Sequence, residues 1–469
     1  MPTTNDTTVK GHVLHHWDPE NPEFWERTGA RIARRNLWIS IISLTLSFAI
    51  WVLWSVVTVN LDKVGFRFTS NQLFWLTALP ALSGATLRVF YSFMVPIFGG
   101  RRWTVISTLS LLLPAVGMGI ALQDSSTSYS TLLILAALCG LGGGNFSSSM
   151  ANISFFYPKA KKGTATGLNA GIGNLGVSLA QFVVPLVISS AMVGSFTGEG
   201  LHYVEKGVEK TLWLQNAGFV WVPFIVISVI LAWFGMNDIA DAKASFKDQA
   251  IIFRRKHNWL MCWLYVGTFG SFIGFSAGLA LLTKSQFPDV NPTQYAFLGP
   301  LVGALTRPVG GWISDRLKAG ATVTLYTFLL MVLGVVGVLF TLPSEGHAGN
   351  FPAFLGMFIL LFALSGIGNG STFRMIPVIF LTARTQEAEK TPEAQRQAVV
   401  QGNKEASAVL GFSGAVGAYG GFFIPKSFGT SLEATGSGDM ALYAFIAFYL
   451  SCMVVTWWFY ARKGARTPC

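Results

Sequence analysis

Two arginines lie in the middle of long apolar stretches of this chain. Arg88 is about 15 residues into one stretch and Arg307 is about 13 residues into another. An arginine at the centre of a bilayer costs roughly 2.5–3.5 kcal/mol to insert, so it usually faces a cavity or a partner. Because a guanidinium stays protonated and offers forked N–H donors, the pair predicts a binding site for a small planar oxyanion.

The sequence shows no acidic partner for these two arginines. Its 22 Asp and Glu residues fall in predicted tails, loops or helix ends, and its six histidines also lie outside the span centres. An empty site would hold two uncompensated charges in a medium of low dielectric constant, which resists reorientation. We therefore expect exchange of one anion for another. Water or backbone groups could still carry protons, so proton-coupled symport is the alternative.

A third cation, Arg374, lies about seven residues from the cytoplasmic end of its predicted span. It either extends to the membrane interface or contributes to the inner part of the pathway. The link at 310–317 carries Asp315 and Arg316 at a helix end. This pair predicts a cytoplasmic latch between helices, with helix capping or a simple topology signal as alternatives.

Glycines recur at close spacing in two segments, 167–176 and 411–421. The first contains a GxGxxG string, but a dinucleotide site needs this string after a strand, whereas here it lies in an apolar helix. Glycines at this spacing let helices approach closely and slide. We expect them either to pack generically or to line a moving surface. They are Gly167, Gly171, Gly173, Gly176, Gly411, Gly414, Gly417 and Gly420.

Polar and aromatic side chains near these glycines are candidates to complete a cage around an anion, although a phenylalanine in a span more often packs against lipid or core. They are Asn145, Phe146, Asn174, Tyr265, Phe269 and Ser413. Sequence pattern alone does not single them out.

The composition indicates the elements that must position these residues. The chain is 52% hydrophobic and 12% charged, against about 25% charged in ordinary soluble proteins, which excludes a soluble globule and a disordered chain. Long apolar stretches without acidic or basic residues predict an all-α polytopic membrane protein with twelve transmembrane helices. The predicted spans are 37–60, 73–97, 103–122, 131–157, 165–191, 213–235, 258–283, 294–315, 321–342, 352–381, 403–428 and 440–461.

The spans divide into two six-helix halves. Gly84 and Arg88 in the second span match Gly303 and Arg307 in the eighth, which indicates an internal repeat. The predicted units are a tail at 1–36, a half at 37–235, a central loop at 236–257, a half at 258–461 and a tail at 462–469. Lys and Arg gather in the tails and alternate loops, which predicts that both termini are cytoplasmic. The net charge of +11 then needs no nucleic-acid partner.

The cysteines show no CxxC or metal-ligand spacing. We therefore expect no disulfide framework, metal or cofactor, and the sequence does not indicate an enzyme. A passive anion channel would also suit paired arginines, but repeated halves with glycine seams favour alternating access. A membrane anchor of a respiratory reductase would need haem-ligating histidines in its spans.

Several segments resemble known signatures. The link at 310–317 resembles the loop signature of the major facilitator superfamily, and 98–102 looks like a copy of it without the acid. The two glycine-rich segments resemble those of the nitrate/nitrite porter family. Further segments similar to the bacterial respiratory nitrate/nitrite antiporters are 34–40, 91–96, 148–156 and 268–275. The resemblance covers nearly the whole chain, although close relatives carry glutamine in place of Arg374.

The resemblance implies a rocker-switch transporter of the bacterial cytoplasmic membrane that imports nitrate and exports nitrite, functional as a monomer. In that family the two arginines hold the substrate. The asparagine of the first glycine signature matches Asn174, the tyrosine of the seventh helix matches Tyr265, and the aromatic walls match Phe146 and Phe269. Asn145, Ser413 and Arg374 are left as possible pathway residues.

Overall fold

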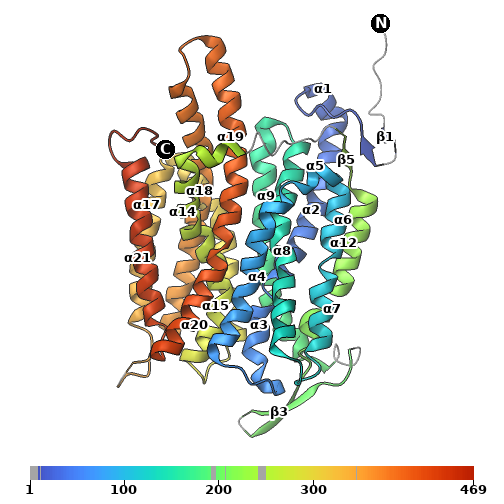
Figure 1. Cartoon of the computed structure of the whole chain (residues 1–469), viewed down its shortest axis with the longest axis vertical. Coiled ribbons are helices and arrows are strands. Elements are labelled where there is room, and N and C mark those ends of the chain that lie inside the picture. Colours follow the sequence, from blue (N-terminus) through green and yellow to red (C-terminus); the bar gives the residue numbers. More distant parts are fainter. Residues whose placement is uncertain (1–8, 11, 192–196, 206, 241–249, 345) are drawn as a thin grey trace.

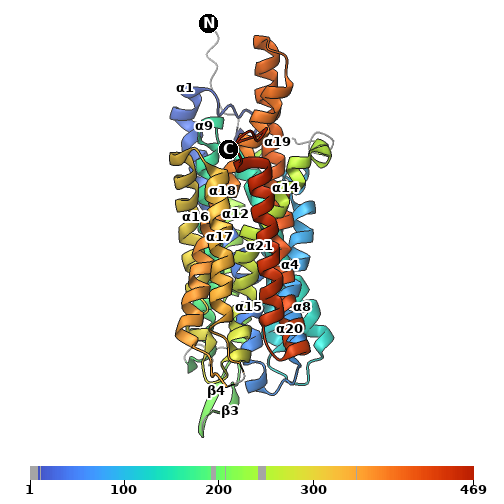
Figure 2. The ribbon, with the colours of Figure 1, turned by 90° about the vertical axis from the view of Figure 1, so that its left-hand side faces the viewer.

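The computed structural model describes residues 9–10, 12–191, 197–205, 207–240, 250–344 and 346–469. Long helices run side by side along one axis (Figures 1 and 2). The elements up to residue 240 are β1 (Val9–Lys10), β2 (Val13–Leu14), α1 (Pro22–Phe24), η1 (Trp25–Gly29), α2 (Ala30–Trp51), α3 (Trp54–Val57), η2 (Thr58–Asn60), η3 (Asp62–Val64), α4 (Ser70–Tyr91), α5 (Met94–Phe98), α6 (Gly100–Leu109), α7 (Leu112–Ala121), α8 (Tyr129–Phe156), α9 (Lys159–Ile188), β3 (Leu201–Glu205), β4 (Val208–Leu212), α11 (Asn216–Phe219), α12 (Val222–Gly235) and β5 (Asp238–Ile239).

The elements from residue 250 onward form a second group beside the first (Figure 1). They are η4 (Ala250–Arg254), α14 (Lys256–Tyr265), η5 (Val266–Gly270), α15 (Ser271–Gln286), η6 (Pro292–Gln294), α16 (Leu298–Leu317), α17 (Gly320–Leu339), α18 (Phe351–Glu387), α19 (Pro392–Ala418), α20 (Gly420–Thr435), α21 (Asp439–Thr456) and η7 (Trp457–Ala461). Strand β1 and the C-terminus lie at one end of the molecule, which we call the terminal end, and the β3–β4 hairpin lies at the other.

Eleven helical segments within the described residues are long and apolar enough to cross a membrane. The predicted polytopic, all-helical character is confirmed. The eighth predicted span, 294–315, is helical as α16 but is not one of the eleven. Helix α16 lies alongside α17 and α18 (Figure 2). Arg307 in its middle and the charged residues at its end lower its hydropathy.

Close packing of glycines fixes the two helices that carry the arginines. In the first group, a Cβ on Gly140 of α8 would lie 2.6 Å from the backbone nitrogen of Gly84 in α4. In the second group, a Cβ on Gly370 of α18 would lie 2.1 Å from the carbonyl oxygen of Arg307 in α16. Only residues without a side chain permit such approaches, so each arginine helix is held against a neighbour by its backbone.

Helices α18 and α19 extend beyond the spans predicted at 352–381 and 403–428. Helix α18 continues to Glu387, and α19 already begins at Pro392. The hydroxyl of Thr391 caps α19 by accepting the N–H of Ala394 at 3.3 Å, and a proline at the first helical position suits a helix start. The resulting helical hairpin projects past the other helices at the terminal end (Figure 2).

The N-terminal segment also forms structure that the sequence did not predict. Strand β2 pairs in parallel with β5, with Val13 opposite Asp238. Asp238 in turn accepts the backbone N–H of Arg101 at 2.8 Å and lies 3.5 Å from its Nε. The 98–102 link therefore does have an acidic partner, supplied from a distant part of the chain. Parts of the predicted tail 1–36 and loop 236–257 lie outside the described residues.

Candidate functional site

Arg88 is completely buried and held by backbone and aromatic groups. Its Nε donates to the carbonyl of Gly143 at 2.8 Å, and its Nη1 donates to the carbonyl of Gly414 at 2.6 Å. The guanidinium carbon lies 4.7 Å from the ring centre of Phe146 and 5.2 Å from that of Phe269. Its Nη2 is buried and has no hydrogen-bond acceptor among the described residues. One donor of Arg88 is thus available to a ligand.

Arg307 is also buried, at 8% exposed. Its Nη2 lies 3.4 Å from the hydroxyl of Tyr265, a long hydrogen bond, and its carbon lies 5.4 Å from the ring centre of Phe373. Its Nη1 is buried without an acceptor in the described part of the chain. Arg307 therefore offers a free donor in the same way as Arg88.

Stacked aromatic rings connect the two arginines. Tyr265 stacks on Phe269 with centroids 5.5 Å apart, and Phe269 stacks on Phe146 at 6.3 Å and 25°. Arg88 lies over Phe146 and Phe269, and Arg307 contacts the hydroxyl of Tyr265, so the three rings link the two guanidinium groups. The structure thus brings together five of the six residues expected to bind substrate.

The sixth, Asn174, is buried, and its Oδ1 has no hydrogen-bond donor among the described residues. Of the possible pathway residues, Asn145 donates to the hydroxyl of Ser47 at 2.8 Å, and its own Oδ1 is likewise unpaired within the described chain. The hydroxyl of Ser413 donates to the carbonyl of Val409 in its own helix. The side chain of Ser413 therefore makes a local contact in this conformation.

No carboxylate neutralises the arginine pair within the described residues. None of the ion pairs found there includes Arg88 or Arg307. The buried Glu405 is paired instead with Arg384 and Arg255. An uncompensated charge in a membrane protein is costly. The two guanidinium groups are thus suited to an anion from outside the chain.

Arg374 does pair with an acidic residue. Its Nε donates to Oδ1 of Asp315 at 2.7 Å, which joins the end of α16 to α18. The contact lies within the second group of helices and is open to solvent on the Asp315 side. Arg316 instead lies over the ring of Trp312 at 5.3 Å. The predicted latch residue Asp315 therefore has Arg374 as its described partner.

The signature glycines fall into two sets. Gly173, Gly176, Gly417 and Gly420 pack so closely that an added Cβ would lie within 3 Å of a neighbouring atom, and on Gly414 it would lie 3.4 Å from Phe146. Gly167, Gly171 and Gly411 instead face open space, with no atom within 4 Å of an added Cβ. The first set supports packing in this conformation, whereas the second set leaves room for the helices to approach.

Contacts between the two groups lie at the arginines and toward the β3 end. Lys284 of α15 donates to the carbonyl of Val59 at 2.7 Å, and Gln181 of α9 donates to the carbonyl of Ser276 at 2.7 Å. Gly167 lies in the first half of α9, and Gly411 lies in α19 three residues before Gly414, whose carbonyl accepts from Arg88. Hydrogen bonds therefore join the groups at the β3 end, whereas no described atom lies within 4 Å of a Cβ added to Gly167 or Gly411.

Sequence reasoning missed Trp51, which supports Arg88. The Trp51 ring lies 4.9 Å from the guanidinium carbon, and its Nε1 donates to the carbonyl of Pro80 at 2.8 Å. Added Cβ atoms on Gly84 and Gly143 would lie 2.7 and 2.6 Å from it. No sequence pattern marks Trp51, because Gly84 and Gly143 lie on two other helices and meet it only when the helices pack.

Comparisons with known proteins agree with this architecture. Residues 37–425 match the model of the Major Facilitator Superfamily. The chain is 52% identical over 452 residues to a nitrate/nitrite transporter, NarU, of Escherichia coli (strain K12), covering 96% of this chain and 97% of the relative. It is 43% identical over 470 residues to a probable nitrate/nitrite antiporter, NarK2, of Thermus thermophilus, covering 98% and 99%. A crystal structure of a D-xylose-proton symporter matches with a TM-score of 0.63 at 12% identity, covering 90% of this chain and 97% of that one.

Proposed function

The chain belongs to the Major Facilitator Superfamily, and on this premise we propose that it exchanges nitrate for nitrite across the cytoplasmic membrane by alternating access. The observation that carries the proposal is the pair of buried guanidinium groups, each with a free N–H and without a carboxylate partner in the described chain. The names of the relatives supply the identity of the anions.

The geometry favours a flat anion. Nη2 of Arg88 and Nη1 of Arg307 are the donors, and hydrogen bonds from charged groups to an anion are short and strong. Phe146 and Phe269 are nearly parallel, with centroids 6.3 Å apart. A flat ion between overlapping rings needs about 7 Å, which is two van der Waals contacts. A planar anion would therefore fit once the rings separate slightly, whereas a bulky tetrahedral ion would not.

Exchange follows from the charge at the site. Arg88 spans the two groups by donating to the Gly414 carbonyl. Moving two unneutralised guanidinium groups through the membrane centre is costly, and a bound anion lowers that cost. The transporter thus reorients when loaded, and an incoming nitrate must be balanced by an outgoing nitrite.

We also propose the arrangement of the moving parts. The six-helix halves 37–235 and 258–461 rock against each other, and Gly167, Gly171 and Gly411 close together when the terminal end shuts. With the termini in the cytoplasm, closure at the terminal end would be closure toward the inside. A single chain holds the complete site, which supports function as a monomer.

Isothermal titration of the purified protein tests the site. We expect nitrate and nitrite to compete for one site per chain. Chloride should bind much more weakly, because a spherical ion does not match the forked N–H donors of the two guanidinium groups. Equal affinity for chloride, or independent binding of nitrate and nitrite at two sites, would contradict the proposal.

A further inference from the structure

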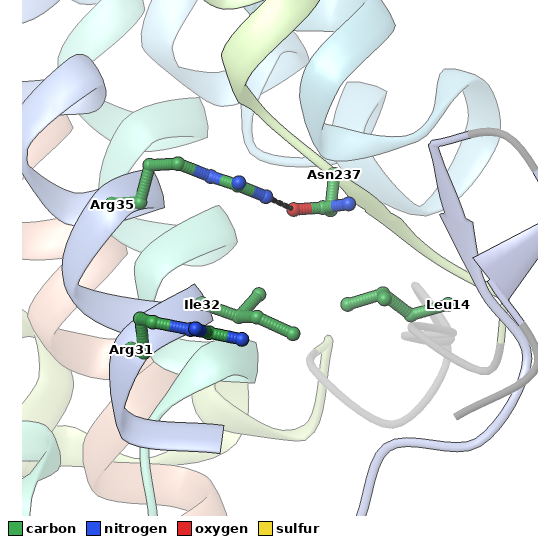
Figure 3. A pocket seen from close by; sticks show the side chains of 5 residues that line it. All are labelled: Leu14, Arg31, Ile32, Arg35 and Asn237. Atoms are coloured by element: carbon green, nitrogen blue, oxygen red, sulfur yellow. Dashed lines mark hydrogen bonds between the residues drawn. The ribbon is translucent and has the colours of Figure 1, made fainter. Parts of the chain in front are cut away.

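A pocket of about 400 Å³ lies at the terminal end of the first helix group, away from the arginine pair (Figure 3). Its walls come from three parts of the chain: the N-terminal segment, the first turns of α2 and the segment after α12. The lining residues are Leu14, Arg31, Ile32, Arg35 and Asn237. In Figure 3 the two arginine side chains extend from α2 toward Leu14 and Asn237.

The pocket is positively charged. Arg31 and Arg35 are one helical turn apart on α2 and are both exposed. Nη2 of Arg35 donates to Oδ1 of Asn237 at 2.7 Å, which fixes one edge of its guanidinium and leaves the other edge free. Within the described residues, no carboxylate lies within 4.0 Å of either guanidinium.

The face of α2 below the pocket is apolar and exposed. Trp38 and Ile42 are 48% and 42% exposed, and their spacing from Arg31 and Arg35 places all four residues on one helix face. In the neighbouring α12, Phe234 is 68% exposed. Large apolar side chains exposed on spanning helices face lipid, and tryptophan is typical of the membrane interface. The pocket thus lies where a basic cluster meets a lipid-facing surface.

We propose that this pocket binds the phosphodiester headgroup of an anionic phospholipid from the leaflet at the terminal end. Two guanidinium forks match the oxygens of a phosphate, and basic pockets at the ends of spanning helices are suited to acidic headgroups. The acyl chains would lie along Trp38 and Ile42. A free phosphate ion shares the headgroup's charge but would gain nothing from this apolar face. The proposal is independent of the transported anion.

Photolabelling of the full-length protein tests the proposal. The probe is a phosphatidylglycerol with a diazirine in its acyl chain, used in phosphatidylcholine vesicles at low salt and competed with unlabelled phosphatidylglycerol. We expect labelled peptides from α2 around Trp38 and Ile42. In Arg31→Gln/Arg35→Gln, half-competition should require about 30-fold more lipid, since each arginine near an anionic membrane surface contributes about 1 kcal/mol, which is roughly fivefold in affinity.

A matched variant separates this site from general surface charge. Arg34→Gln/Lys159→Gln removes two exposed cations from the same end of the same helix group, neither of which lines the pocket, and should compete like the wild type. Arg31→Gln alone is the variant to use if the double pocket variant does not insert, because it removes no hydrogen bond described in the structure. It should weaken competition about fivefold. Unchanged competition in the pocket variants, or displacement by inorganic phosphate as effective as by phosphatidylglycerol, would overturn the proposal.

Discussion

Replacing Arg88 with lysine keeps the charge of the site but removes its geometry. The arginine donates to the Gly143 and Gly414 carbonyls and still has Nη2 free. A lysine has a single nitrogen, which cannot reach two carbonyls on different helices and an anion together. A hydrogen bond to a charged group contributes about 1.5–3 kcal/mol. Loss of the hydrogen bond from Nη2 of Arg88 to the anion therefore predicts roughly 10- to 100-fold weaker anion binding.

The assay combines nitrite titration of purified Arg88→Lys with nitrate uptake into proteoliposomes, and a thermal unfolding curve establishes that the variant folds. Arg316→Lys is the matched control, because Arg316 lies at the end of α16 over Trp312. We expect the control to bind and transport like the wild type. Binding and uptake by Arg88→Lys within about threefold of the wild type would refute the reasoning that fork geometry matters.

Three further predictions follow from the surroundings of the site. Gly411→Leu should abolish exchange without lowering the unfolding temperature, because a side chain fits the present conformation but blocks closure. The control Gly356→Leu, also in open space, should transport at the normal rate. A normal rate for Gly411→Leu would contradict the closure model. Trp51→Phe should lose about 0.5–1.5 kcal/mol of stability in an unfolding experiment, because its hydrogen bond to Pro80 is removed. It should also bind nitrite more weakly in a titration. Unchanged affinity would exclude a role for Trp51 in positioning Arg88. Asp315→Asn should change the transport rate by less than about fivefold, since an exposed ion pair is worth about 0–1 kcal/mol; a complete loss of uptake would instead identify the contact with Arg374 as an essential latch.

The sequence predicted the features that depend on charge in an apolar chain. Arg88 and Arg307 are conspicuous because a charged residue in a long apolar stretch needs a reason to be there. Their matching positions in two repeats also indicated that both belong to one site. The structure places both arginines around the same set of stacked rings.

Other features could not be predicted because they depend on contacts between distant residues or on the backbone. Trp51 is one of 15 tryptophans, and an apolar helix gives no sign of which one lies against an arginine. The carbonyls of Gly143 and Gly414 have no side-chain signature. Asp238 lies 137 positions from Arg101, so the acidic partner of that link emerges only when β5 is placed in space.

The most direct test of anion exchange is nitrate uptake into proteoliposomes, loaded with nitrite or left empty, with an internal pH dye and the membrane potential clamped. We predict uptake only into nitrite-loaded vesicles, with one nitrite released per nitrate taken up and no change in internal pH. Uptake into empty vesicles that is driven by a proton gradient and acidifies the lumen would contradict exchange and would establish proton-coupled symport.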